Sequence, residues 1–174
     1  MGGRGTDRHR DPYRWAIAQG IAALYYLVSM KIEIKKQNHQ CEYTLTRANG
    51  SMESITLDTK TYLLHDICHF AVEKHLKYPK GFWGMLAQGH AFLDLFGKDN
   101  PQTTELRFIE QMVGPVQSVH SGHIPKQDLG LYIEHLDSTI EENVLDAMLA
   151  EIGTTMAHWE KLEVGQQLTL EWNL

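Results

Sequence analysis

Hydrophobic and polar positions alternate along residues 31 to 57, which is the pattern of half-buried β-strands. The stretches "KIEIKK" and "EYTLTR" each place apolar side chains on one face and polar side chains on the other. Asn49-Gly50 precedes a third strand, "SMESITL", and Asn-Gly is a strong hairpin signal because both central residues of a type I′ turn need positive φ. These residues predict a three-stranded meander. The alternating "QLTLEWNL" at the end of the chain predicts a fourth strand that joins it.

After Asp58 the period becomes that of helices. Residues 59 to 78 have the length of one helix and precede Pro79-Lys80-Gly81, a sequence that stops helices. Residues 82 to 96 predict a second helix, although they contain Gly84 and Gly89. Because glycine lowers helix propensity, its presence here predicts close packing of the backbone against a neighbour.

The second half of the chain predicts three further helices. Gly114-Pro115 should kink or end the first of them, and residues 125 to 136 predict a short one. Ser138 and Glu141 have the spacing of a capping box and precede the longest helical pattern of the sequence.

The 174 residues suffice for one domain with its own core. We predict an α+β fold over residues 30–174, in which a three- to four-stranded antiparallel sheet, made of the N-terminal meander and the C-terminal strand, packs against a helical bundle. Residues 1–29 are predicted to be an N-terminal extension or a helix. Their arginines and apolar run have the length of a secretory signal, but Gln19 and Gly20 interrupt the run and no A-x-A-like site follows. A start of the natural protein at Met30 is a further alternative.

Charge and cysteine content narrow the classes of function. Sixteen Lys and Arg against twenty-two Asp and Glu give a net charge of −6, and without a basic block we expect no nucleic-acid partner. The apolar run in residues 1–29 is too short for stable membrane insertion. Cys41 and Cys68 are predicted to be reduced, which is typical of a cytoplasmic protein, with export through residues 1–29 as the alternative. Ten histidines stand out, because imidazole is the commonest metal ligand.

The stretch "YLLHDICHFAVEKH", residues 62 to 75, concentrates the candidate chemistry. At about 100° per residue, His65 and His69 lie roughly 40° apart on the helix and share a sector with apolar side chains. They should therefore face the interior or a cleft. Asp66 and Glu73 fall in a narrow polar wedge together with two lysines.

Two inward imidazoles four residues apart fit two chemistries. One is a hydrogen-bonded pair of core histidines, and the other is a divalent metal site, with zinc as the first candidate. The sequence H-D-x-x-H is a shortened relative of the H-E-x-x-H zinc helix, in which the acid is the general base. Asp66 and Glu73 are accordingly the candidate catalytic residues that activate bound water. Taken alone, Glu73 is better explained by an exposed pair with Lys77.

A metal site needs a third ligand from elsewhere in the chain. Glu110 is the first choice, because it lies beside apolar residues of its helix, where an unpaired carboxylate would be costly. His90 is the second choice, and a satisfied core histidine is its competing explanation.

Residues 62–97 resemble an uncharacterised bacterial family in which "HD-x-x-H-x-x-V-E" is followed by "GF-x-G-x-x-A-x-G". The matching letters here are His65, Asp66, His69, Val72 and Glu73, then Gly81, Phe82, Gly84, Ala87 and Gly89. The resemblance implies no established activity. It also places Glu110 ahead of His90, because the position of His90 looks like an aromatic residue in members of that family.

"LLHDI" is also similar to the core of HD-domain metal phosphohydrolases, in which an adjacent His-Asp pair binds metal. Those domains are all-helical, whereas this chain begins with strands. The leading hypothesis is a metal-dependent hydrolase acting on a small molecule or peptide. The alternatives are a non-enzymatic binding domain with a buried histidine network and, third, an HD-like phosphohydrolase.

Overall fold

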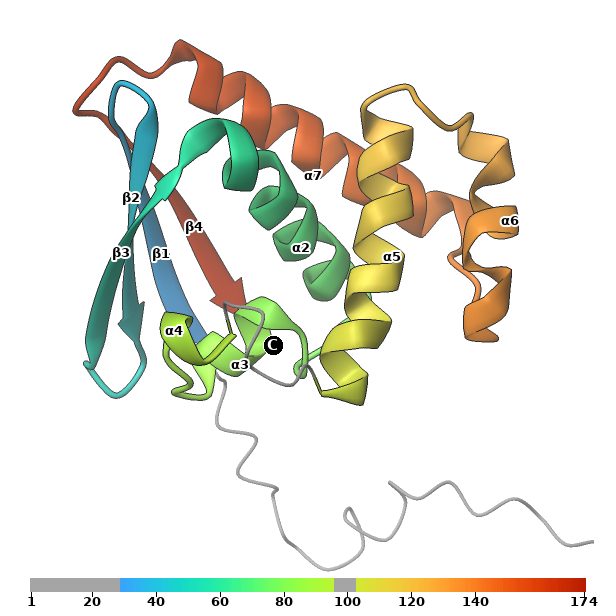
Figure 1. Cartoon of the computed structure of the whole chain (residues 1–174), viewed down its shortest axis with the longest axis horizontal. Coiled ribbons are helices and arrows are strands. Elements are labelled where there is room, and N and C mark those ends of the chain that lie inside the picture. The colour runs from blue at the N-terminus through green and yellow to red at the C-terminus, as the bar shows by residue number, and fades with distance from the viewer. Residues whose placement is uncertain (1–28, 96–102) are drawn as a thin grey trace, which may run out of the picture.

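The computed structural model describes residues 29–95 and 103–174 and has an α+β fold (Figure 1). The sheet is antiparallel with strand order β3-β2-β1-β4, so the C-terminal strand pairs with the first strand of the meander, as predicted. The four strands are β1 (Ser29–Lys36), β2 (Gln40–Arg47), β3 (Met52–Asp58) and β4 (Gln167–Asn173).

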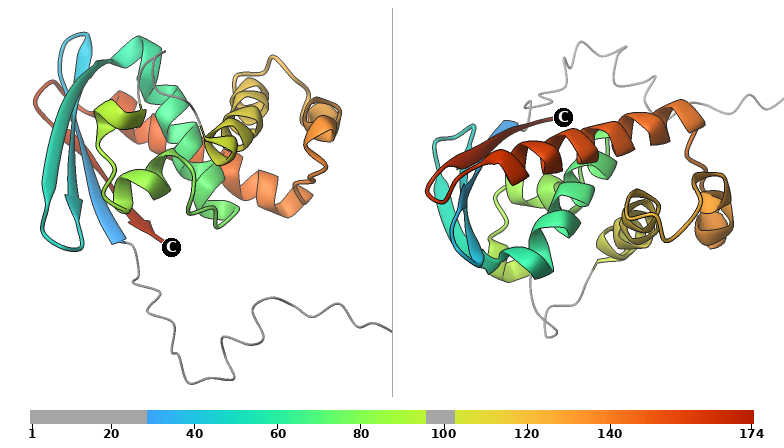
Figure 2. Two further views of the ribbon diagram at one scale, coloured as in Figure 1. Left: turned by 60° about the horizontal axis from the view of Figure 1, so that its bottom comes forward. Right: turned by 90° about the horizontal axis from the view of Figure 1, so that it is seen from above.

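The helices cover one face of this sheet, and α2 lies between the sheet and α5 (Figures 1 and 2). The helical segments are a π-helical turn (Thr59–Leu63), α2 (Leu64–His75), α3 (Phe82–Ala87), α4 (Phe92–Leu95), α5 (Thr104–His120), α6 (Leu129–Ile133) between 3-10 turns (Lys126–Asp128 and Glu134–Leu136), and α7 (Glu142–Lys161). The helix α2 contacts both α5 and α7. It is therefore enclosed on several sides.

Strand alternation produces the covered face. Ile32 and Ile34 of β1 pair with Leu45 and Tyr43 of β2, and all four are fully buried. Their polar neighbours along each strand point to the other face, which the helices leave open. Apolar side chains of one face are removed from water while the polar ones stay hydrated, and this stabilises the observed register.

The β2–β3 hairpin forms at Asn49-Gly50, but its turn differs from the predicted type I′. Gly50 has φ of +81°, whereas Asn49 is not among the described residues with positive φ. The Gly50 N–H donates to the Arg47 carbonyl at 2.8 Å, and the Arg47 N–H donates to the Ser51 carbonyl at 3.0 Å. The loop is thus one residue longer, with a single left-handed residue at its end.

The single helix predicted over residues 82 to 96 is wrong, because the structure divides this segment into α3 and α4. Gly89 has φ of +103° and allows the chain to turn between them. Gly84 does fulfil the prediction of close packing, since a Cβ on it would overlap the Pro79 carbonyl.

Two further predictions concern helix ends. Of the kink or end predicted at Gly114-Pro115, the end does not occur, because α5 continues to His120. The longest described helix, α7, begins at Glu142, and its N-cap Glu141 makes no side-chain capping bond, so the predicted capping box does not form.

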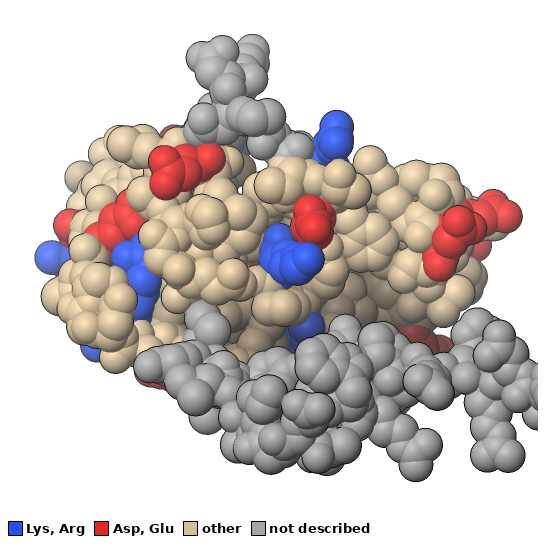
Figure 3. Space-filling view, turned by 90° about the horizontal axis from the view of Figure 1, so that it is seen from below, with Lys and Arg blue, Asp and Glu red and all other residues tan. Residues whose placement is uncertain are grey.

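Among the described residues, no helix has the length and apolar character needed to cross a membrane. Charged side chains are scattered in small groups over the face drawn in Figure 3, and its described part has no continuous basic surface. The predictions for the N-terminal segment concern residues 1–28, which lie outside the described residues, and Ser29, where β1 begins.

Candidate metal centre

The helix α2 presents His65, His69 and Glu73 on successive turns of one stripe. His69 and Glu73 are buried, with 2% and 0% of their surface exposed, and the His65 side chain is 35% exposed. The inward orientation predicted for the histidines is therefore found. The polar wedge predicted for Asp66 and Glu73 is wrong, since Asp66 is buried as well. The reason is that α2 packs against the sheet, α5 and α7, whereas an ordinary amphipathic helix is covered on one face only.

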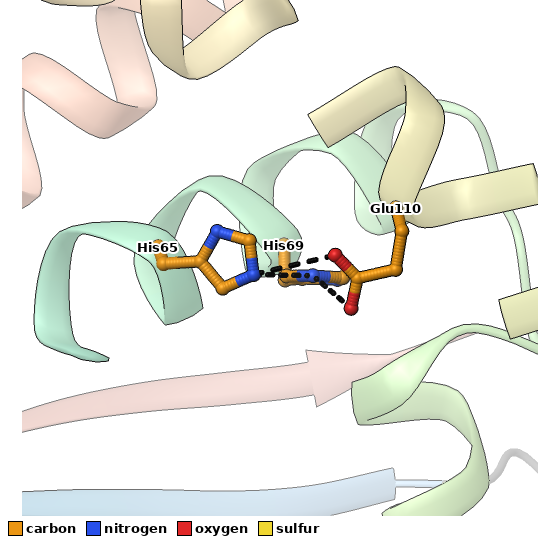
Figure 4. A group of neighbouring side chains, drawn as sticks. All are labelled: His65, His69 and Glu110. Carbon is orange, nitrogen blue, oxygen red and sulfur yellow. Dashed lines mark hydrogen bonds and ion pairs between the residues drawn. The ribbon is translucent and has the colours of Figure 1, made fainter. Parts of the chain in front are cut away.

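Glu110 of α5 faces the two histidines (Figure 4). The Nε2 atoms of His65 and His69 are 3.2 Å apart. His65 Nε2 lies 3.4 Å from Glu110 Oε2, and His69 Nε2 lies 3.3 Å from Glu110 Oε1. The three residues offer one ligand atom each within 4.8 Å of one another, so the group could hold a metal ion.

The separation of the two Nε2 atoms fits the size of a metal ion, and Glu110 approaches each nitrogen with a different carboxylate oxygen. Tetrahedral zinc has bonds of about 2.0–2.1 Å to nitrogen and oxygen, which puts neighbouring ligand atoms about 3.3 Å apart. Two imidazoles and a carboxylate also suit other divalent first-row metals. The separations therefore support a small divalent ion without selecting one.

Each imidazole has its second ring nitrogen occupied by an acceptor. His69 Nδ1 lies 3.0 Å from Glu73 Oε1, and His65 Nδ1 lies 3.0 Å from Gln117 Oε1. Both oxygens are acceptors, so each hydrogen bond forms when Nδ1 carries the ring proton. With the proton on Nδ1, a neutral imidazole keeps its lone pair on Nε2. Both lone pairs then point toward the same place, beside Glu110.

Sequence reasoning missed Gln117. It lies seven residues after Glu110, two turns along the same face of α5, and this spacing was the available signal.

The Glu73 carboxylate is held by the segment that follows α2. Its Oε2 accepts hydrogen bonds from the backbone N–H groups of Trp83 at 3.0 Å and Gly84 at 3.2 Å. A Cβ on Gly81 would overlap this carboxylate. Glu73 thus fits a cradle built from α3, and its oxygens are engaged by His69 and the backbone. This arrangement suits orientation of His69, and the predicted catalytic role of Glu73 stays a prediction.

The electrostatics of the group depend on its two carboxylates. Burial opposes a charge on His69, but the carboxylates of Glu110 and Glu73 outweigh it and raise its pKa to about 9. Burial alone would raise the pKa of Glu110, yet the two histidines hold it well below its usual range. With no metal bound, a proton on His69 therefore sits where an ion would bind.

Asp66 lies on the side of α2 that faces the sheet. Its Oδ2 accepts a hydrogen bond of 2.8 Å from the Tyr43 hydroxyl, and its backbone carbonyl accepts one of 2.9 Å from Trp83 Nε1–H. Burial raises the pKa of Asp66 to about 6, although the bond from Tyr43 opposes that shift. Asp66 stays outside the three-residue group, and its role as general base is a prediction.

His90, the second choice for the third ligand, is not brought to the group. It is exposed after α3, and its backbone carbonyl accepts a hydrogen bond of 2.9 Å from Arg47 Nη2. The chain turns at Gly89, so His90 does not continue the helix that precedes it. A core position for His90 is wrong for the same reason.

Comparisons with protein-family models, with curated proteins and with solved structures each found no match. The resemblance to the uncharacterised bacterial family stays a prediction.

Proposed function

We propose that His65, His69 and Glu110 hold a divalent metal ion, with zinc as the first candidate, and that the ion activates water for hydrolysis. The observation that carries this proposal is the convergence of the two Nε2 atoms and the Glu110 carboxylate at separations of 3.2 to 3.4 Å. Glu73 and Gln117 add support, because histidine ligands of metals usually donate their other N–H to a protein acceptor.

Three protein ligands leave positions for water and substrate on a divalent ion. A bound metal lowers the pKa of its water toward neutrality and so supplies hydroxide. The side chains of His65 and Glu110 are 35% and 37% exposed, which gives solvent access at one side of the group. The substrate of such a site would be a small molecule or peptide that reaches this side.

The second candidate is a binding domain in which the same residues form a metal-free network. It is favoured by the fact that His69 finds acceptors for both ring nitrogens in Glu73 and Glu110. An HD-type phosphohydrolase has less support, since Asp66 would have to join His65 at the metal and instead bonds Tyr43.

Metal content of untagged protein separates the two candidates. We expect about one equivalent of metal in the wild type after zinc loading and dialysis, and its loss in His69→Gln and Glu110→Gln. The matched controls are His75→Gln on α2, whose imidazole pairs with Glu151, and Glu105→Gln on α5, whose carboxylate pairs with Lys80. Both controls should keep the metal. No bound metal in the wild type, or equal losses in the controls, would refute the metal site.

Hydrolysis is tested on the loaded protein with a panel of carboxylic esters, phosphoesters and short peptides. Activity should disappear with a chelator and in Glu110→Gln, and return when zinc is restored to the wild type. Activity that survives complete removal of the metal contradicts the mechanism.

A further inference from the structure

We propose that Gln117 is a positioning residue that selects the metal-binding tautomer of His65. This inference rests on the proposed metal site. Gln117 Oε1 lies 3.0 Å from His65 Nδ1. The other ring nitrogen of His65, Nε2, faces Glu110 (Figure 4). The two partners are 52 positions apart in the sequence, so the packing of α5 on α2 creates the contact.

The reason lies in the single proton of a neutral imidazole. When Nδ1 carries the proton, Nε2 keeps a lone pair that a metal can use; when Nε2 carries it, that nitrogen cannot coordinate. The acceptor Oε1 of Gln117 stabilises the first state. Without it, His65 is free to place its proton on Nε2 and donate to Glu110, which lies 3.4 Å away.

The two histidines differ in how strongly their acceptor fixes the proton on Nδ1. Glu73 is a carboxylate and accepts through either oxygen, so it fixes the proton of His69 on Nδ1. Gln117 carries both an acceptor and a donor, and the amide works only with its oxygen toward His65. His65 is therefore the ligand whose tautomer depends on the orientation of one amide.

The position of Gln117 links the tautomer of His65 to the placement of the third ligand, Glu110. Glu110 and Gln117 lie two turns apart on one face of α5, and α5 is continuous between them. One helix thus supplies both the third ligand and the acceptor that prepares the first. Gln117 is half-buried, so its replacement should leave the core of the protein intact.

Two substitutions in the full chain isolate this role. Gln117→Met keeps the length of the side chain and removes the acceptor, and Gln117→Glu keeps an acceptor that cannot donate. Gln111→Met is the matched control, because Gln111 is an exposed residue of α5 whose Oε1 bonds His135 Nε2 at 3.1 Å. Thermal unfolding of each variant checks that the fold is kept.

The first measurement is the histidine tautomer in metal-free protein, read by nitrogen–proton correlation NMR at alkaline pH. We expect His65 to carry its proton on Nδ1 in the wild type, Gln117→Glu and Gln111→Met, and to shift toward Nε2 in Gln117→Met. The second is zinc affinity, which should fall about 10- to 100-fold in Gln117→Met. It should be kept or raised in Gln117→Glu and unchanged in Gln111→Met.

An unchanged tautomer of His65 in Gln117→Met overturns the inference, and so does an equal loss of zinc affinity in both Gln117 variants. Failure of the proposed function is distinguishable from this result. If the wild type binds no zinc, the metal site is refuted, while the tautomer of His65 in metal-free protein still decides the role of Gln117.

Discussion

Zinc and a proton should compete for His69, and pH is the perturbation that reveals it. Metal binding needs the Nε2 lone pair of His69, whereas the carboxylates of Glu110 and Glu73 overcome burial and raise the pKa of this imidazole to about 9. At neutral pH the metal-free site therefore holds a proton, and an incoming ion must displace it.

The magnitude follows from the distance between the working pH and that pKa. At pH 7, two units below 9, the apparent zinc affinity should lie about 100-fold below its limiting value, which equals about 3 kcal/mol. At pH 8 the loss should be about tenfold. The sign is fixed: affinity rises with pH and levels off near pH 9, where His69 has lost its proton.

Calorimetric titration with zinc between pH 6.5 and 8.5, in buffers of different ionisation enthalpy, measures both quantities. We expect the logarithm of the affinity to rise by about one per pH unit, with about one proton released per zinc ion at pH 7. The control is His75→Gln, which should give the same slope because His75 pairs with Glu151 outside the group. An affinity independent of pH, or binding without proton release, refutes the reasoning.

Three further predictions concern the surroundings of the group. Gly81→Ala should displace the Glu73 carboxylate, destabilise the protein by about 1–3 kcal/mol in chemical denaturation and weaken zinc binding. Its control is Gly153→Ala, whose Cβ meets no atom closer than 3.9 Å and which should stabilise α7 by about 0.5–1 kcal/mol in the same assay. Asp66→Asn should raise the melting temperature at pH 7.5 and have little effect at pH 4. Burial raises the pKa of Asp66 to about 6, so its charge destabilises the fold by up to about 3 kcal/mol above pH 6. This penalty disappears as the pH falls toward the pKa of Asp66 in the unfolded chain. An effect of Asp66→Asn that is the same at every pH contradicts this account. In metal-free protein the protonated His69 should stabilise the fold by at most about 3 kcal/mol below pH 6.5, a contribution lost as pH rises through 9 and missing from the unfolding profile of His69→Gln.

The sheet was predictable because alternation along a strand is a local signal. The residues that alternate in "KIEIKK" and "EYTLTR" are the ones that pair across β1 and β2. The break between α3 and α4 was not predicted, because apolar spacing continues across Gly89 and only the backbone angle of that residue reveals the turn.

The candidate site likewise has residues that a local sequence signal predicts and residues that it does not. Helix geometry alone predicts that His65 and His69 share one face and that the Glu110 carboxylate lies on an apolar face, where it needs a partner. The structure brings these residues together. Burial of Glu73 could not be predicted from a helix wheel, since it depends on backbone donors supplied by α3. Gln117 carries no charge, and its spacing from Glu110 becomes informative only once α5 is known to pack on α2.

If His65, His69 and Glu110 hold a metal as proposed, their uneven depth would set a route for its exchange. His69 is 2% exposed, whereas the side chains of His65 and Glu110 are 35% and 37% exposed. An ion arriving from solvent therefore meets the outer pair before the inner imidazole, and a departing ion leaves them last. Chelators should accordingly reach the metal from the side where His65 and Glu110 are exposed, without any opening of the core.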